Sequence, residues 1–77
     1  MARYFFDLMC DDDTLADDAG QDFASLDAVR SEVRRILPDM VRDEMANIER
    51  TSMSVCVRDA GGRLIYEASL VFSERWH

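Results

Sequence analysis

Hydrophobic and polar residues alternate along the last third of the chain, and this pattern predicts a β-hairpin. Residues 53–58 place Met53, Val55 and Val57 on one side, with more polar positions between them. Residues 64–72 continue the same alternation over a longer strand. The sequence Asp-Ala-Gly-Gly between them contains two glycines, which supply the positive φ angles of a tight turn. We therefore predict a hairpin over residues 52–74.

The middle third has the spacing of an amphipathic helix, because apolar residues recur every three or four positions. The apolar stripe consists of Leu26, Val29, Val33, Ile36, Leu37, Met40, Val41, Met45 and Ile48. Ser25 precedes the stripe and is a favourable N-cap residue. Pro38 interrupts the helix without shifting the phase of the stripe, which predicts either a kink or two abutting helices. The helix is expected to end over residues 47–51.

The first third predicts a strand, an acidic turn and a short return strand. Residues 3–9 are rich in aromatic residues and are followed by Asp-Asp-Asp at 11–13, a turn-forming run. The return strand is expected over residues 14–18, before a second turn at Ala19-Gly20. The resulting order is ββαββ, which defines an α+β fold: one antiparallel sheet with one long, Pro-kinked helix packed on one face. We assign residues 1–77 to a single small domain.

The longest predicted strand is apolar on both of its faces, although one helix covers only one face of a sheet. Phe5, Ile65 and Val71 are expected to lie together on the uncovered face, and Trp76 near the end of the chain is a further candidate contact residue. These residues are either scattered surface hydrophobic groups or the interface of a homodimer. A homodimer could form through this face or by edge pairing of strands.

Charge is distributed unevenly along the 77 residues. Residues 1–27 hold eight acidic residues and one arginine, and the rest of the chain is balanced, so the net charge of −7 lies in the first third. An acidic surface repels phosphate groups, which argues against nucleic acid as a partner. The acidic segment is either a solvated hairpin or a binding surface for a basic protein. Its candidate residues are Asp11, Asp12, Asp13, Asp17 and Asp18.

The residue types that catalysis usually requires are scarce, and we predict that the protein is not an enzyme. The one histidine, His77, is the last residue, where a side chain is poorly held. The acidic run lacks the oxygen ligand and the glycine that a calcium loop needs at its fifth and sixth positions. We therefore predict no catalytic, cofactor-binding or metal-binding residues, although loose binding of divalent cations by the acidic segment stays open.

Two cysteines and the absence of any long apolar segment indicate where the protein resides. No run approaches the length needed to span a membrane, and the charged residue Asp7 follows too soon for an export signal. Cys10 and Cys56 are expected to be reduced thiols in the cytoplasm, with a disulfide between them as the alternative.

Several short segments resemble a family of small bacterial proteins found in rhizobia and related alphaproteobacteria. They are Arg3–Leu8, Asp18–Gly20, Leu26–Arg30 and Val57–Arg63, so the resemblance covers nearly the whole chain. The family is classified only as a domain of unknown function, and the resemblance implies no activity, cofactor or catalytic residue. A weaker, fold-level likeness to HicB-type antitoxin domains implies a protein that sequesters a partner.

Together these patterns predict a non-enzymatic protein–protein interaction domain that forms a homodimer. Its apolar contact is expected to involve Phe5, Ile65, Val71 and Trp76. The alternative function is an antitoxin-like inhibitor, in which the acidic N-terminal hairpin binds a basic partner protein.

Overall fold

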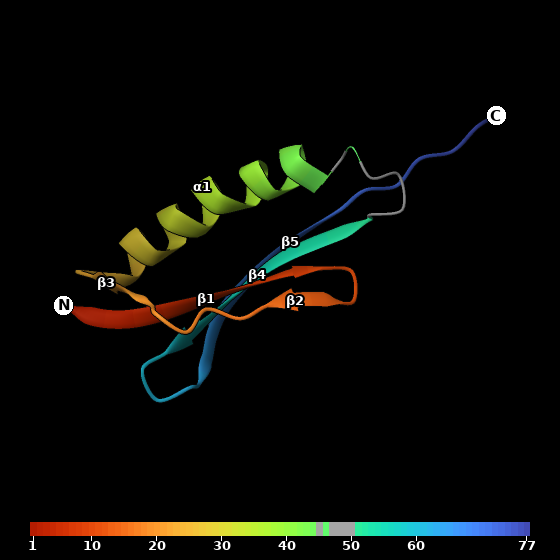
Figure 1. Ribbon diagram of the computed structural model, residues 1–77. Coiled ribbons are helices and arrows are strands. Elements are labelled where there is room, and N and C mark those ends of the chain that lie inside the picture. Colours follow the sequence, from red (N-terminus) through yellow and green to blue (C-terminus); the bar gives the residue numbers. More distant parts are fainter. Residues whose placement is uncertain (45, 47–50) are drawn as a thin grey trace.

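The computed structural model describes residues 1–44, 46 and 51–77. Within these residues the chain forms a five-stranded antiparallel sheet with one helix packed against it (Figure 1). The elements are β1 (Ala2–Cys10), β2 (Asp13–Leu15), β3 (Gln21–Phe23), α1 (Leu26–Glu44), β4 (Ser52–Asp59) and β5 (Leu64–Val71). The predicted α+β class, with one antiparallel sheet and one helix, is confirmed.

The two shortest strands share one edge of β1. The sheet order is β2-β1-β4-β5, and β3 also pairs with β1. β2 pairs with residues 8–10 of β1, and β3 pairs with residues 2–4 at its other end. The predicted return strand at 14–18 is therefore wrong in its extent, because β2 ends at Leu15. The sequence pattern did not predict β3, whose three residues are too few to show an alternation.

Helix α1 begins where the sequence predicts. The Ser25 hydroxyl accepts a hydrogen bond from the Ala28 backbone N–H at 3.1 Å, as an N-cap residue does. The helix runs through Pro38 as one element, so the alternative of two abutting helices is wrong. The predicted helical positions Met45 and Ile48 and most of the predicted helix exit lie outside the described residues. None of the described helical residues forms a segment long and apolar enough to cross a membrane.

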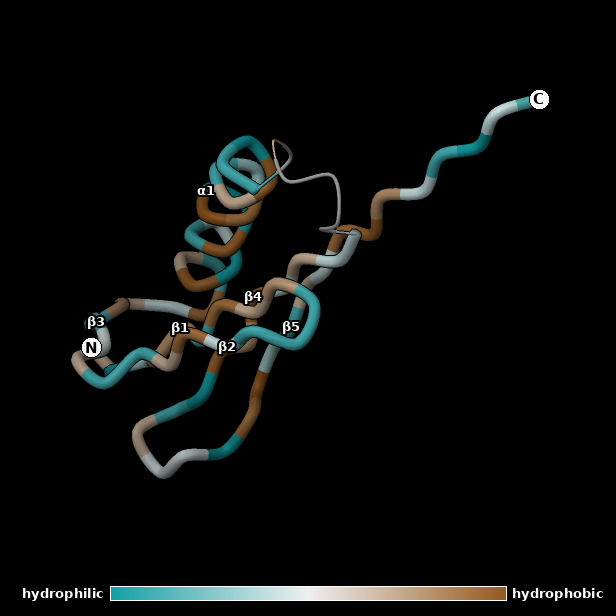
Figure 2. The backbone as a smooth tube through the Cα atoms, turned by 45° about the vertical axis from the view of Figure 1, so that its right-hand side comes forward, coloured by the Kyte–Doolittle hydropathy of each residue, from teal (hydrophilic) through white to brown (hydrophobic). Residues whose placement is uncertain are grey.

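The hydrophobic core lies between α1 and the two central strands, β1 and β4. It consists of Phe6, Val29, Val33, Leu37, Met40, Met53, Val55 and Val57. Alternate residues of β4 enter this core because successive side chains of a strand point to opposite faces. Figure 2 shows brown, hydrophobic stretches along α1 and along the strands of the sheet, and a teal, hydrophilic turn between β1 and β2.

The hairpin of β4 and β5 contains an irregularity that the sequence pattern did not reveal. Val57 pairs with Tyr66 but Arg58 pairs with Leu64, so Ile65 is an additional residue in a β-bulge. Ile65 lines a hollow together with Leu26, a residue of α1. The prediction that Ile65 lies on the sheet face opposite the helix is therefore wrong, because the bulge changes the direction of its side chain.

The chain beyond β5 runs away from the body of the protein. Residues 72–77 have no helix or strand, and the C-terminal end projects beyond the sheet in both views (Figures 1 and 2). The Trp76 side chain is fully exposed. This residue therefore does not pack back onto the domain.

Candidate functional site

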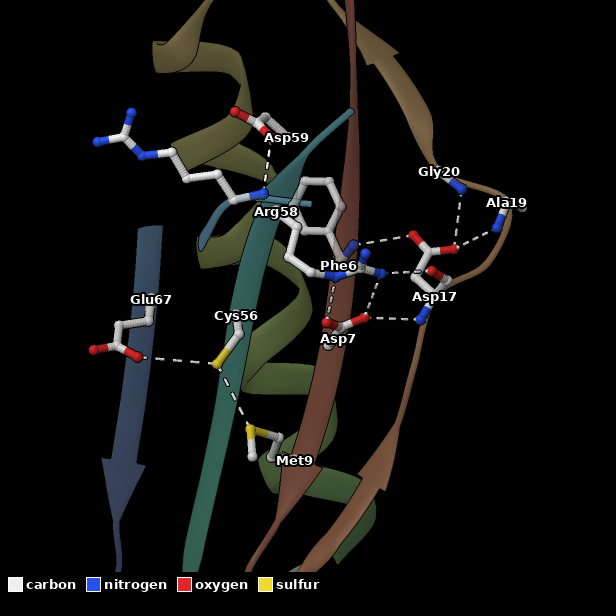
Figure 3. A network of polar contacts seen from close by, with 11 residues as sticks. Phe6, Asp7, Met9, Asp17, Ala19, Gly20, Cys56, Arg58, Asp59 and Glu67 are labelled. Carbon is white, nitrogen blue, oxygen red and sulfur yellow. Dashed lines mark hydrogen bonds and ion pairs between the residues drawn. The ribbon is translucent and has the colours of Figure 1, made fainter. Parts of the chain in front are cut away.

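The sheet face opposite α1, which we call the outer face, carries a network of polar contacts around Arg58 (Figure 3). The Arg58 guanidinium donates two hydrogen bonds to the Asp7 carboxylate, from Nε at 2.7 Å and from an Nη nitrogen at 3.1 Å. The same Nη nitrogen donates to the Asp17 backbone carbonyl at 2.9 Å. The guanidinium also lies 5.2 Å from the centre of the Phe5 ring, within cation–π distance.

Asp17 lies in the loop between β2 and β3, beside the middle of β1, where neither short strand pairs. Its carboxylate accepts hydrogen bonds from the backbone N–H groups of Phe6 at 3.0 Å, Ala19 at 3.1 Å and Gly20 at 3.0 Å. Its own backbone N–H donates to the Asp7 carboxylate at 2.9 Å. The middle of β1 therefore has a side-chain partner where the two short strands leave its edge unpaired.

Both carboxyl groups of the network are held in their charged form. The hydrogen bonds from Arg58 lower the pKa of Asp7, and burial opposes this effect only in part. The backbone N–H groups of Gly20 and Phe6 lower the pKa of Asp17. A general acid or base near neutral pH needs a pKa close to the working pH, so this network is suited to holding the fold together.

We expect the free energy of unfolding to fall as the solution becomes acidic, because folding lowers the pKa of Asp7 and Asp17 below 3.8, their ordinary value. Their contribution is present in full above about pH 5 and is lost as the pH falls through the lowered values. Urea denaturation followed by circular dichroism in a pH series will measure this loss. Asp17→Asn removes one titrating group and should make the decline shallower, whereas a wild-type midpoint independent of pH would contradict the prediction.

The Cys56 thiol lies on the outer face but is not activated. It is 3.6 Å from the Met9 sulfur and 4.0 Å from a Glu67 carboxylate oxygen (Figure 3). Burial and the negative charge of Glu67 raise the pKa of the thiol, which keeps it protonated and weakly nucleophilic. Cys10 packs against the core on the other face of the sheet. Both cysteines are among the described residues and neither is in a disulfide, so the alternative of a bridge is wrong.

The structure separates the five acidic residues that the sequence grouped together. Asp17 belongs to the outer-face network, and Asp11 joins the first hairpin to the start of β4. The Asp11 carboxylate accepts hydrogen bonds from the Thr51 hydroxyl at 3.1 Å and the Ser52 backbone N–H at 3.0 Å. Asp11 has a φ of 52°, a left-handed conformation that aspartate tolerates. The exposed remainder is Asp12, Asp13 and Asp18. In the described parts of the chain, no group of acidic, cysteine or histidine side chains could hold a metal ion.

The four predicted contact residues do not form one patch. Phe5 is half-buried beneath the Arg58 guanidinium, Ile65 faces the helix side, and Trp76 extends away from the domain. Val71 is 73% exposed and lies in β5. Exposed apolar side chains instead follow the β5 segment and the residue after it. They are Leu64 and Ile65 at the start of β5 and Leu70, Val71 and Phe72 at its end, and we call this set the β5 edge.

A shallow hollow accompanies the β5 edge on the helix side. It is lined by Arg34, Leu37, Pro38 and Leu70, and it lies where α1 passes over β5. Leu70 is 47% exposed in this hollow, although its position in the alternation faces the core side of the sheet. The helix therefore covers β5 incompletely.

Sequence reasoning missed the pairing of Asp7 with Arg58. The available signal was two residues of opposite charge at outward positions of two predicted strands. That signal becomes a contact only when β1 and β4 are neighbours, and the sheet order was not predicted. The register pairs Phe5 with Arg58 and Asp7 with Cys56, which brings the arginine within reach of both β1 residues.

These features define a small α+β domain with one helix-covered sheet face and one face whose polar groups bind each other. A family model described as "Domain of unknown function (DUF6894)" matches residues 3–71. The chain belongs to this family, which confirms the predicted membership of a family of unknown function. Comparisons with curated proteins and with solved structures found no match. The likeness to HicB-type antitoxins stays a prediction.

Proposed function

We propose that this protein is a non-enzymatic protein–protein interaction domain that acts as a homodimer. The observation that supports the proposal is the β5 edge, a set of exposed apolar side chains at the two ends of an outermost strand. Native proteins commonly protect edge strands with charges, proline, bulges or short strand length. Between its bulge and its end, β5 carries one charged residue, Glu67, and no proline or lysine.

A binding role also accounts for the chemistry of the outer face. Asp7, Asp17 and Arg58 use their polar atoms on each other and on the backbone, and the Cys56 thiol has a raised pKa. None of these groups is prepared to attack or protonate a substrate. The two cysteines outside any disulfide fit a reducing compartment, and we place the protein in the cytoplasm.

An antitoxin-like inhibitor that binds a basic protein is the second candidate. It draws on three exposed acidic residues, Asp12 and Asp13 in the hairpin of β1 and β2 and Asp18 in the loop that follows β2. The geometry favours it less than the homodimer, because Asp11 and Asp17 are committed to contacts within the domain. The acidic surface that such a partner would meet is therefore smaller than the sequence suggests.

The homodimer can be tested by light scattering coupled to gel filtration. We expect the wild-type protein to have twice the mass of one chain. The double variant Leu70→Lys/Val71→Lys introduces the residue type that natural edge strands use against pairing, and it should be a folded monomer. The matched control is Leu15→Lys, because Leu15 is an apolar residue of similar exposure (68%) on the opposite edge of the sheet.

The measured masses distinguish three cases: a monomer, a dimer through β5, and a dimer through the opposite edge of the sheet. Circular dichroism must show an unchanged fold in both variants for the comparison to count. A wild-type protein with the mass of one chain would contradict the homodimer. If Leu15→Lys dissociates a wild-type dimer and the β5 double variant does not, the contact lies at the opposite edge of the sheet, formed by β2 and β3.

A further inference from the structure

The two edges of the sheet differ in how well they are protected. One edge consists of β2 and β3, which are three residues each and are separated by the loop that carries Asp17. The other edge is β5, which is eight residues long. In the described part of the chain, no strand pairs with the outer side of β5. A second strand can therefore pair along β5, whereas the edge formed by β2 and β3 offers no continuous stretch of backbone for such pairing.

The register of the hairpin shows which backbone groups of β5 point outward. The Phe72 N–H donates to the Thr51 carbonyl at 2.7 Å, so Phe72 directs its backbone toward β4. Backbone direction alternates along an antiparallel strand, and the pairing from Val57–Tyr66 to Ser52–Val71 is continuous. The N–H and C=O groups of the odd-numbered residues therefore face the outer edge. These residues are Glu67, Ser69 and Val71.

From these observations, and resting on the proposed homodimer, we infer that β5 of one copy pairs antiparallel with β5 of a second copy, with Ala68 on the two-fold axis. Residues directly opposite each other in an antiparallel pair point to the same face. A two-fold axis must therefore pass through a residue pair, and Glu67, Ala68 and Ser69 are the central choices. An axis at Glu67 would place two carboxylates opposite each other, which is destabilising.

The axis at Ala68 gives favourable neighbours on both faces. Glu67 of each copy faces the Ser69 hydroxyl of the other, and Tyr66 faces Leu70. Ala68 meets its own copy at a position without ladder hydrogen bonds, where the two Cα atoms approach to about 4.5 Å. The small side chain of alanine suits this close approach. An axis at Ser69 would instead place the Glu67 carboxylate opposite the apolar Val71.

The same pairing explains the incomplete cover of β5 by α1. Tyr66 of the second copy would lie beside Leu70, at the hollow lined by Arg34, Leu37 and Pro38. The pairing would join two sheets into one continuous sheet, with both helices on the same face. The exposed apolar residues of the β5 edge would then flank the central Glu67–Ser69 segment, with Leu70 of each copy beside Tyr66 of the other.

Disulfide trapping tests this register directly. In a Cys10→Ser/Cys56→Ser background, Ala68→Cys places two thiols on the axis within the range that a disulfide requires. Leu70→Cys is the matched control, because its two copies would be about 13 Å apart along the strands. With oxidised glutathione as the oxidant, we expect Ala68→Cys to form the covalent dimer roughly tenfold faster than Leu70→Cys.

Ala68 packs against the core, so Ala68→Cys could fail to fold, and a second variant tests the same register independently. Glu67→Cys/Ser69→Cys places the thiols on the exposed face, where each Cys would meet the other type across the axis. The double variant should cross-link and each single variant should not. Removal of Cys56 is essential here, because Cys56 pairs with Glu67 within the chain.

The results separate this inference from the proposed homodimer. If the wild-type protein is a dimer by light scattering but neither Ala68→Cys nor the double variant cross-links, the β5 pairing is wrong and the homodimer stands. Rapid cross-linking of Leu70→Cys or of a single variant would overturn the register. A monomeric wild-type protein would refute the homodimer itself.

Discussion

Replacing Asp17 with alanine is expected to lower the free energy of unfolding by about 3 kcal/mol. The Asp17 carboxylate accepts hydrogen bonds from three backbone N–H groups, and the one on Phe6 is partly buried in the middle of β1. Hydrogen bonds to a charged group contribute more than neutral ones, and a buried N–H without a partner is costly. Alanine removes all three acceptor contacts at once and leaves the central part of β1 without a partner on that side.

Urea denaturation followed by circular dichroism will measure the change. Fluorescence is the poorer probe, because Trp76 is already fully exposed in the folded protein. The matched control is Asp18→Ala, which removes one negative charge from the neighbouring residue, as Asp17→Ala does. Asp18 is exposed, and its replacement should change stability by less than about 0.5 kcal/mol. Equal effects of the two substitutions would mean that the Asp17 contacts contribute only through charge.

The contrast between these two aspartates marks the limit of what the sequence predicts. The apolar stripe of α1 and the Gly-Gly turn of the β4–β5 hairpin are local signals, and both elements lie where they were expected. The acidic segment carries no local signal that distinguishes Asp17 from Asp18. The distinction arises because Asp17 lies opposite the centre of β1, where the backbone of Phe6 lacks a strand partner.

The candidate contact surface was predicted only in part, because local patterns identify a strand but not the contacts that its residues make with distant strands. Alternation identified β5 as a strand with apolar residues on both sides, and Val71 is exposed as expected. It could not identify the bulge that turns Ile65 toward the helix, because a bulge adds a residue without changing the composition of the strand. Nor could it reveal that Phe5 is covered, since the cover comes from Arg58 on a strand distant in sequence.

The position of Gly20 shows how closely the loop before β3 is fitted to β1. Gly20 has a φ of 73°, and its backbone N–H binds the Asp17 carboxylate. A Cβ atom at this position would lie 2.9 Å from a Phe5 ring carbon and 3.0 Å from the Tyr4 carbonyl oxygen. The carbonyl belongs to the backbone of β1 and cannot move aside without disturbing the sheet. Glycine is therefore required here for its conformation and for its size.

Gly20→Ala is accordingly expected to lower the free energy of unfolding by about 3 kcal/mol, of which backbone strain accounts for about 1 and crowding for the rest. Gly62→Ala is the matched control, because Gly62 has a similar φ of 85° but nothing lies within 4 Å of its Cβ position. That variant should lose only the strain contribution, about 1 kcal/mol. Urea denaturation of both variants measures the difference. Equal losses would show that the loop relaxes away from β1 without cost, and the close fit between Gly20 and β1 would then contribute nothing to stability.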